Sequence, residues 1–211
     1  MDVSNITVNA QNSICIDFGK KIYIDPFKIE SGANDADYIF LTHDHYDHFS
    51  LEDLNKVGKM ESIFVVPEAM DKKVRKNTAF GKNFPVKPGE CYETEDFTFE
   101  TIPMYNKIKP FHPKRSGWCG YVLNLDGTRV YIAGDIDAIK EAAEVKCDIA
   151  LIPIGGTYTM DPKEAAGLIN KMRPKIVVPV HYGDIVGKKS YGDDFAKLVD
   201  DGIEIVRLLS V

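Results

Sequence analysis

The side chains best able to do chemistry in this chain are three histidines and an aspartate within six residues. His43, His45, Asp47 and His48 form the pattern His-x-His-x-Asp-His, directly after the apolar run at 38–41. Neutral imidazoles and carboxylates are ligands that suit zinc, iron and manganese. Because the pattern offers more ligands than one tetrahedral ion needs, we expect His43 and His45 to serve one ion and Asp47 and His48 a second. The alternative is a polar loop that happens to be rich in histidine, and clustered His and Asp residues argue against it.

Two further residues follow apolar strands in the same way. Asp135 comes after the run at 129–133, and His181 directly follows the run at 175–180. Alone, each would be an ordinary loop residue. A strand that ends in a polar residue is a rigid place to hold a ligand, so beside the histidine motif we predict that both residues bind metal.

These candidate ligands must be positioned by strands and helices, which the spacing of apolar residues predicts. Short apolar or alternating runs indicate strands at 6–8, 13–18, 21–24, 38–41, 63–66, 97–104, 121–125, 129–133, 148–154, 176–180 and 203–209. Capped or amphipathic stretches indicate helices after Ser50 and at 67–76, 136–145, 161–172 and 193–201. Strands and helices occur in both halves, without a repeat at a fixed period. We therefore predict an α/β protein with two sheets face to face and helices outside.

The composition restricts the class of protein. With 211 residues, 44% of them hydrophobic, the chain can form one domain over 1–211 with a sizeable core. The formal net charge of -6 disfavours a general nucleic-acid binder or a binder of anionic membranes. No apolar run is long enough to span a bilayer, and no secretion signal is recognisable at the start. Four scattered cysteines are predicted to be buried, reduced thiols of a cytoplasmic protein, and the oligomeric state is open.

The stretch at 107–118 is locally basic in an acidic chain, and it holds two prolines, His112 and the only tryptophan. Prolines favour a stiff loop over a helix. If this loop covers the metal site, Lys114 and Arg115 can bind an anionic group of the substrate. His112 can then donate a proton to the leaving group or bind the developing oxyanion. A charged surface loop with a surface histidine is the alternative.

The run Thr-His-Asp-His-Tyr-Asp-His at 42–48 resembles the signature of the metallo-β-lactamase superfamily. Over about 22–181 the chain is similar to its small stand-alone hydrolases, the group related to ascorbate-6-phosphate lactonase. The resemblance implies a four-layer αββα sandwich with two divalent ions at one edge, zinc first and Mn²⁺ or Fe²⁺ as alternatives. It implies that Asp135 bridges the ions and that His181 joins Asp47 and His48. It also favours an outer role for Asp25, behind a ligand histidine, over an ordinary turn before Pro26.

In one position the chain departs from the family pattern. A further histidine usually follows the strand predicted at 97–104, whereas Asn106 stands at or next to that position here. An amide oxygen is a weak zinc ligand compared with imidazole. We therefore expect Asn106 to face the substrate side of the site, with His112 or water completing the ligands of the first ion.

Taken with the resemblance, these residues predict a hydrolase that directs a metal-bound hydroxide at a small anionic ester, lactone or phosphodiester, with Asp47 orienting the nucleophile. A nucleic-acid processing hydrolase, such as a tRNA-end nuclease, is the alternative, disfavoured by the acidic balance and the absence of an inserted basic arm. An iron redox protein would need an electron-supplying domain that the sequence does not show. A scaffold that has lost its chemistry would not be expected to keep six candidate ligands.

Overall fold

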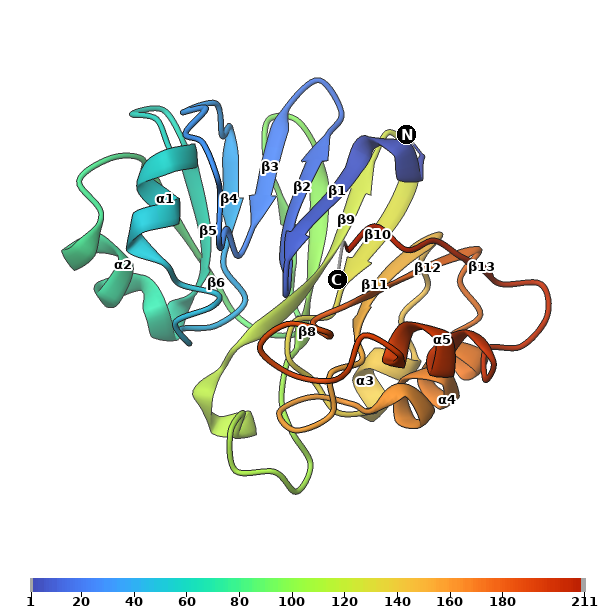
Figure 1. The fold of residues 1–211 in the computed structure, drawn as a ribbon. Coiled ribbons are helices and arrows are strands. Elements are labelled where there is room, and N and C mark those ends of the chain that lie inside the picture. The colour runs from blue at the N-terminus through green and yellow to red at the C-terminus, as the bar shows by residue number, and fades with distance from the viewer. Residues whose placement is uncertain (1, 210–211) are drawn as a thin grey trace.

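A computed structural model describes residues 2–209 of the chain as two mixed β-sheets packed face to face (Figure 1). The strand order of the first sheet is β1 (Ile6–Ala10), β2 (Ser13–Asp17), β3 (Lys21–Ile24), β4 (Tyr38–Phe40), β5 (Ile63–Pro67) and β6 (Lys82–Val86). The order of the second is β13 (Glu204–Ile205), β12 (Ile176–Val180), β11 (Ile149–Pro153), β10 (Thr128–Ile132), β9 (Cys119–Leu125), β8 (Thr98–Pro103) and β7 (Cys91–Glu93).

The helices lie on the outer sides of the two sheets, which confirms the predicted four-layer sandwich (Figure 1). Helices α1 (Leu51–Val57) and α2 (Asp71–Asn77) flank the first sheet. Helices α3 (Lys140–Ala143), α4 (Pro162–Met172) and α5 (Tyr191–Ala196) flank the second. Short 3₁₀ turns occupy Val3–Asn5, Glu68–Met70 and Lys114–Ser116. None of the helices between residues 2 and 209 is long and apolar enough to cross a membrane.

Burial follows the layers. Strand β1 alternates buried and exposed residues, as expected for a strand with only one covered face. Strands β4 and β11 are buried along their whole length because a sheet or a helix covers each face. The main core lies between the sheets and continues under α4, while a smaller one packs α1 and α2 against β4 and β5.

All of the predicted strands form, but two edge strands were not predicted. Strand β6 contains Pro85 and is largely polar, and β7 is only three residues long, so neither has the apolar pattern of a central strand. Three predicted elements are shorter than expected: α3 covers only Lys140–Ala143, α5 ends at Ala196, and β13 has two residues. Of these, β13 is the edge strand of its sheet, so only one neighbouring strand extends it.

The prediction of buried thiols holds only in part. All four cysteines are free, and Cys119 is buried. Cys91, however, is exposed because it lies on the edge strand β7, and Cys15 and Cys147 are half-buried.

The strand directions bring the candidate ligands to one edge of the sandwich. Strands β3 and β4 are parallel neighbours, so Asp25 and His43 follow strand ends on the same side of the first sheet. Strands β10, β11 and β12 are likewise parallel, which places Asp135 and His181 at one side of the second sheet. Residues up to about 150 positions apart therefore meet where the two sheets share an edge.

Candidate metal centre

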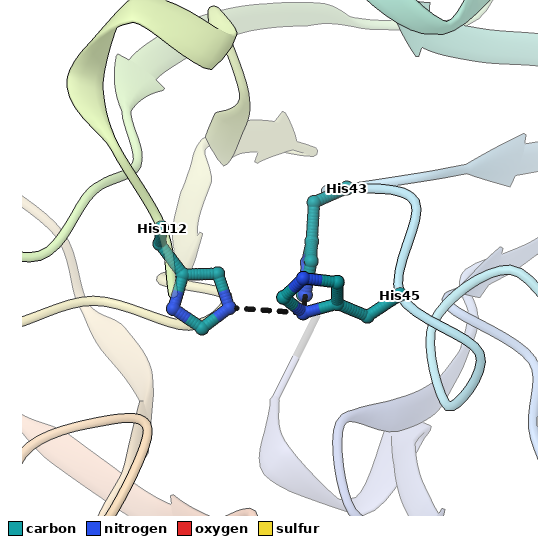
Figure 2. A group of neighbouring side chains, drawn as sticks. All are labelled: His43, His45 and His112. Carbon is teal, nitrogen blue, oxygen red and sulfur yellow. Dashed lines mark hydrogen bonds between the residues drawn. The ribbon is translucent and has the colours of Figure 1, made fainter. Parts of the chain in front are cut away.

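Three histidines could together hold one metal ion, and they are called the first ligand set: His43, His45 and His112. They come from two loops and point toward one another (Figure 2). Nδ1 of His45 lies 3.1 Å from Nε2 of His43 and 3.2 Å from Nε2 of His112. His43 and His112 are fully buried, and His45 is half-buried. Burial lowers the pKa of His43 well below its ordinary value and that of His112 to about 4. These rings are therefore neutral near pH 7, as metal ligation requires.

A second group that could hold an ion, called the second ligand set, consists of Asp47, His48 and His181. The two Nε2 atoms of His48 and His181 lie 3.3 Å apart, and Oδ2 of Asp47 lies 3.5 Å from the first and 3.4 Å from the second. Burial alone would raise the pKa of Asp47, but the hydrogen bond with His181 and the charge of His48 outweigh burial and lower it. Burial likewise opposes the charged form of His48, but Asp135 and Asp25 raise its pKa to about 9.

Asp135 lies between the two sets and presents one oxygen to each. Oδ1 is 3.5 Å from Nε2 of His48 and 3.3 Å from Nε2 of His181. Oδ2 is 3.5 Å from Nε2 of His112 and 4.0 Å from Nε2 of His43. Although buried, Oδ1 makes no hydrogen bond with any residue that the structure describes. Buried polar atoms almost always have a hydrogen-bond partner, so a buried carboxylate oxygen without a donor is a candidate metal ligand. With Asp135, each set offers four nitrogen and oxygen ligands, the number of a tetrahedral zinc site.

Asp25 supports this centre from behind. Its Oδ2 accepts hydrogen bonds from Nδ1 of His48 at 2.7 Å, from Asn12 at 2.8 Å and from the Thr42 hydroxyl at 2.6 Å, and its Oδ1 accepts from the Thr42 backbone N–H at 2.8 Å. Asp25 also lies close enough to His43 and His48 for the three to hold an ion. Its oxygens, however, already accept these four hydrogen bonds, which favours the supporting role over metal binding. The hydrogen bond holds one proton of His48 on Nδ1, so Nε2 is the nitrogen that can bind metal once its own proton has left.

The Thr42 hydroxyl extends the same arrangement to the first set. It donates to Asp25 and lies 3.0 Å from Nδ1 of His43, from which it can accept. His43 is thereby held with Nε2 toward His45. One buried carboxylate thus orients a histidine of each set, directly for His48 and through Thr42 for His43.

Asn106 orients the ring of His112 in the way that Asp25 orients the ring of His48. Its Oδ1 accepts from Nδ1 of His112 at 2.8 Å and from the His112 backbone N–H at 3.2 Å. Its Nδ2 donates to Oδ1 of Asp137 at 3.1 Å and to the Tyr158 carbonyl at 3.0 Å. The structure therefore places Asn106 behind His112, and His112 in the position of the third imidazole of the first set. Asp137, itself paired with Lys109 at 2.8 Å, had no recognisable signal in the sequence.

The structure does not bring Lys114 and Arg115 to the metal centre. Nζ of Lys114 donates to Glu141 at 2.7 Å and lies 4.6 Å from the centre of the Tyr105 ring, and Arg115 is exposed. Neither residue lines the cavity beside the ligands.

That cavity has a volume of about 380 Å³ and opens directly onto the two ligand sets. His45, Asp47, Asp135 and His181 form its polar floor. Its remaining lining residues are aromatic or aliphatic, namely Tyr46, Phe111, Tyr158, Ile185 and Val186. The sequence carries no signal for these five, because isolated apolar residues in loops have no periodic pattern.

Comparison with known proteins identifies the family of this chain. Residues 5–181 match the model of the β-lactamase superfamily domain. A relative from Thermococcus onnurineus, named as a UPF0173 metal-dependent hydrolase, is 31% identical over 204 residues, which cover 90% of this chain and 89% of the relative. A crystal structure from Parabacteroides distasonis, also named as a metal-dependent hydrolase, superimposes with a TM-score of 0.82 at 31% identity, covering 97% of this chain and 93% of the other.

More distant structures share the fold alone. An isothiocyanate hydrolase from Delia radicum gut bacteria is 16% identical and has a TM-score of 0.72, with 97% of both chains covered. At that identity the likeness supports the arrangement of sheets and helices and nothing finer.

Proposed function

This chain belongs to the metallo-β-lactamase superfamily and is a metal-dependent hydrolase, and we propose that it uses two zinc ions to hydrolyse a small anionic ester, lactone or phosphodiester. The observation that carries the proposal is the position of Asp135, with one oxygen toward each ligand set. A single ion would need only one of the two sets.

The donor atoms support zinc as the metal. Five imidazoles and two carboxylates surround the centre, and zinc binds nitrogen and oxygen ligands of this kind in tetrahedral geometry. Mn²⁺ and Fe²⁺ accept the same residue types and are the alternatives that metal analysis must separate. When bound, two such ions polarise the scissile group and lower the pKa of a water toward neutrality.

Asp47 and His112 have different roles in the proposed reaction. Asp47 is ionised, because its pKa is lowered, so it can accept a hydrogen bond from the attacking water and orient it. His112 is neutral at pH 7, and its Nδ1 proton is bound by Asn106. This favours His112 as a ligand over the proton donor that we considered from the sequence.

An anionic substrate is compatible with a cavity that has no lysine or arginine in its lining. Two divalent ions would bring four positive charges, Asp47 and Asp135 bring two negative ones and a bound hydroxide would bring a third, which leaves a net of one positive charge. In a partly enclosed site this charge attracts the carboxylate or phosphate of a substrate without further help. The cavity also lacks the basic track that a nucleic-acid backbone requires, which disfavours the nuclease alternative.

The four free cysteines support our prediction of a reducing, cytoplasmic setting. That location remains a prediction.

Metal analysis of the purified protein, followed by assays on model lactones, esters and phosphodiesters with the metal found, tests the proposal. His43→Ala and His181→Ala remove one ligand from each set and should abolish hydrolysis with loss of bound metal. Asp17→Ala, which removes an exposed carboxylate on β2, is the matched control and should keep both. Full metal content in both histidine variants would contradict the assignment of the ligands.

A further inference from the structure

We propose that the substrate carries a compact apolar group beside the scissile bond, and that five residues around the cavity mouth select it. These residues, Tyr46, Phe111, Tyr158, Ile185 and Val186, are called the apolar collar. The inference deepens the proposed function and rests on it.

The collar holds an unusual share of the exposed apolar side chains. Among residues 2–209, eight large hydrophobic side chains are exposed, and four of them line this one cavity. Their exposed fractions are 66% for Tyr46, 40% for Phe111, 37% for Tyr158 and 38% for Ile185. Exposed apolar side chains that gather around a polar centre mark a binding surface, whereas scattered ones need no explanation. The four come from separate loops, so the sequence order does not explain their meeting.

The collar is also held in place by the metal centre. The rings of Phe111 and Tyr158 meet edge to face with centroids 4.6 Å apart. Phe111 directly precedes the ligand His112, and the Tyr158 carbonyl accepts the hydrogen bond from Asn106. The same residues that orient the first ligand set therefore fix the position of this aromatic pair. A preformed apolar wall of this kind can select a substrate without first being ordered.

The lining of the collar offers no cation to a substrate. Lys28 is paired with Asp184, and Lys109 with Asp137 at 2.8 Å. Within residues 2–209, no lysine or arginine lines the cavity. A substrate can therefore present its charged or polar reacting group to the metals, but the part that faces the collar must be apolar. A volume of about 380 Å³ is at the small end for ligand pockets, which restricts that part to a short alkyl chain or one ring.

A series of γ-lactones whose alkyl tail grows from methyl to butyl tests the collar in the metal-loaded enzyme. These substrates are uncharged and share one reacting group, so kcat/KM compares the tails alone. Burial of each added methylene should raise kcat/KM of the wild type by about fourfold. Phe111→Ala and Tyr158→Ala should reduce that increase to less than about twofold per methylene, and Phe111→Leu should restore most of it. Met60→Ala and Leu198→Ala remove exposed apolar side chains elsewhere and should keep the wild-type increase.

A binding measurement on the metal-free protein makes the collar testable apart from catalysis. The dissociation constants of n-butanol, n-pentanol and n-hexanol, measured by NMR titration, should fall by about fourfold per methylene, and this trend should disappear in Phe111→Ala. If no lactone, ester or phosphodiester is hydrolysed but the alcohols show the trend, the collar is supported and the proposed function fails. If the chain-length dependence is absent from the wild type, or is equal in all variants, the collar is overturned.

A second copy of the chain is the other conceivable occupant of the collar. Sedimentation of the wild type and of Phe111→Ala distinguishes the two. A monomer in both cases agrees with a substrate site. A wild-type dimer that dissociates in the variant, with no chain-length dependence in either protein, would make the collar a subunit interface and overturn the proposal.

Discussion

Replacing Asn106 by alanine should weaken metal binding although Asn106 belongs to neither ligand set. The side chain fixes His112 through two hydrogen bonds to its Oδ1, one of them from the ring Nδ1 at 2.8 Å. Without that acceptor, the His112 ring is free to carry its proton on Nε2, the atom that faces His43 and His45. The first ligand set would then offer two reliable imidazoles in place of three.

The structure sets the size of the effect. Loss of a hydrogen-bond partner behind a ligand histidine typically costs 10–100-fold in metal affinity, so we expect a decrease of about that size for one of two ions. Each buried donor left without an acceptor also costs about 1–3 kcal/mol, so the free energy of unfolding of the metal-free variant should fall as well. Asp137 keeps its contact with Lys109 at 2.8 Å, which limits the structural damage.

Competition with a chromophoric chelator measures the two metal affinities, and urea unfolding of the metal-free protein measures stability. Asn106→Asp keeps an acceptor for His112 but places a second carboxylate beside Asp137, so it should retain metal affinity while losing stability. Asn170→Ala is the control, because the Asn170 side chain, like that of Asn106, both donates and accepts: it donates to the Leu198 carbonyl and accepts from the Asp200 N–H, both at 2.9 Å. It should lower stability only. Wild-type affinity for both ions in Asn106→Ala would refute the role of Asn106 and weaken that of His112 as a ligand.

Three further predictions follow from single contacts. Asp25→Ala should lower the free energy of unfolding of the metal-free protein, measured in urea, by about 3–5 kcal/mol. The reason is that the substitution leaves charged His48 buried and places alanine at a φ of 45°. An unfolding free energy equal to that of the wild type within experimental error would contradict the ion pair. Lys114→Ala should leave KM for an anionic substrate within about twofold of the wild type, because Lys114 is paired with Glu141 and its charge is screened by solvent. A tenfold rise in KM would show that the basic loop reaches the substrate, as the sequence led us to expect. Metal affinity should rise by about tenfold per pH unit toward pH 9, because the pKa of His48 is raised to about 9 in the metal-free centre and its proton must leave when metal binds. Calorimetry in buffers of different ionisation enthalpy measures the released proton. If no proton is released, His48 is neutral before metal binds.

The sequence alone was sufficient to predict that the candidate ligands placed by adjacency or by strand ends lie together. His43, His45, Asp47 and His48 lie within six residues, so any loop that follows β4 keeps them close together. Asp135 lies two residues beyond its apolar run and His181 directly follows its own, and parallel strands deliver such residues to a common edge. Local rules of this kind are also why every predicted strand formed, while the edge strands β6 and β7, which lack an apolar pattern, were missed.

Only the tertiary structure decided what the loops do. His112 and His45 are 67 positions apart, and nothing local distinguishes a loop histidine that turns inward from one that faces water. The same holds for three other contacts: the pairing of Lys114 with Glu141, the position of Asn106 behind His112, and the meeting of four separate loops in the apolar collar. Each depends on where distant segments pack. Contacts of that kind are fixed by the sum of many weak interactions across the fold, which no short stretch of sequence contains.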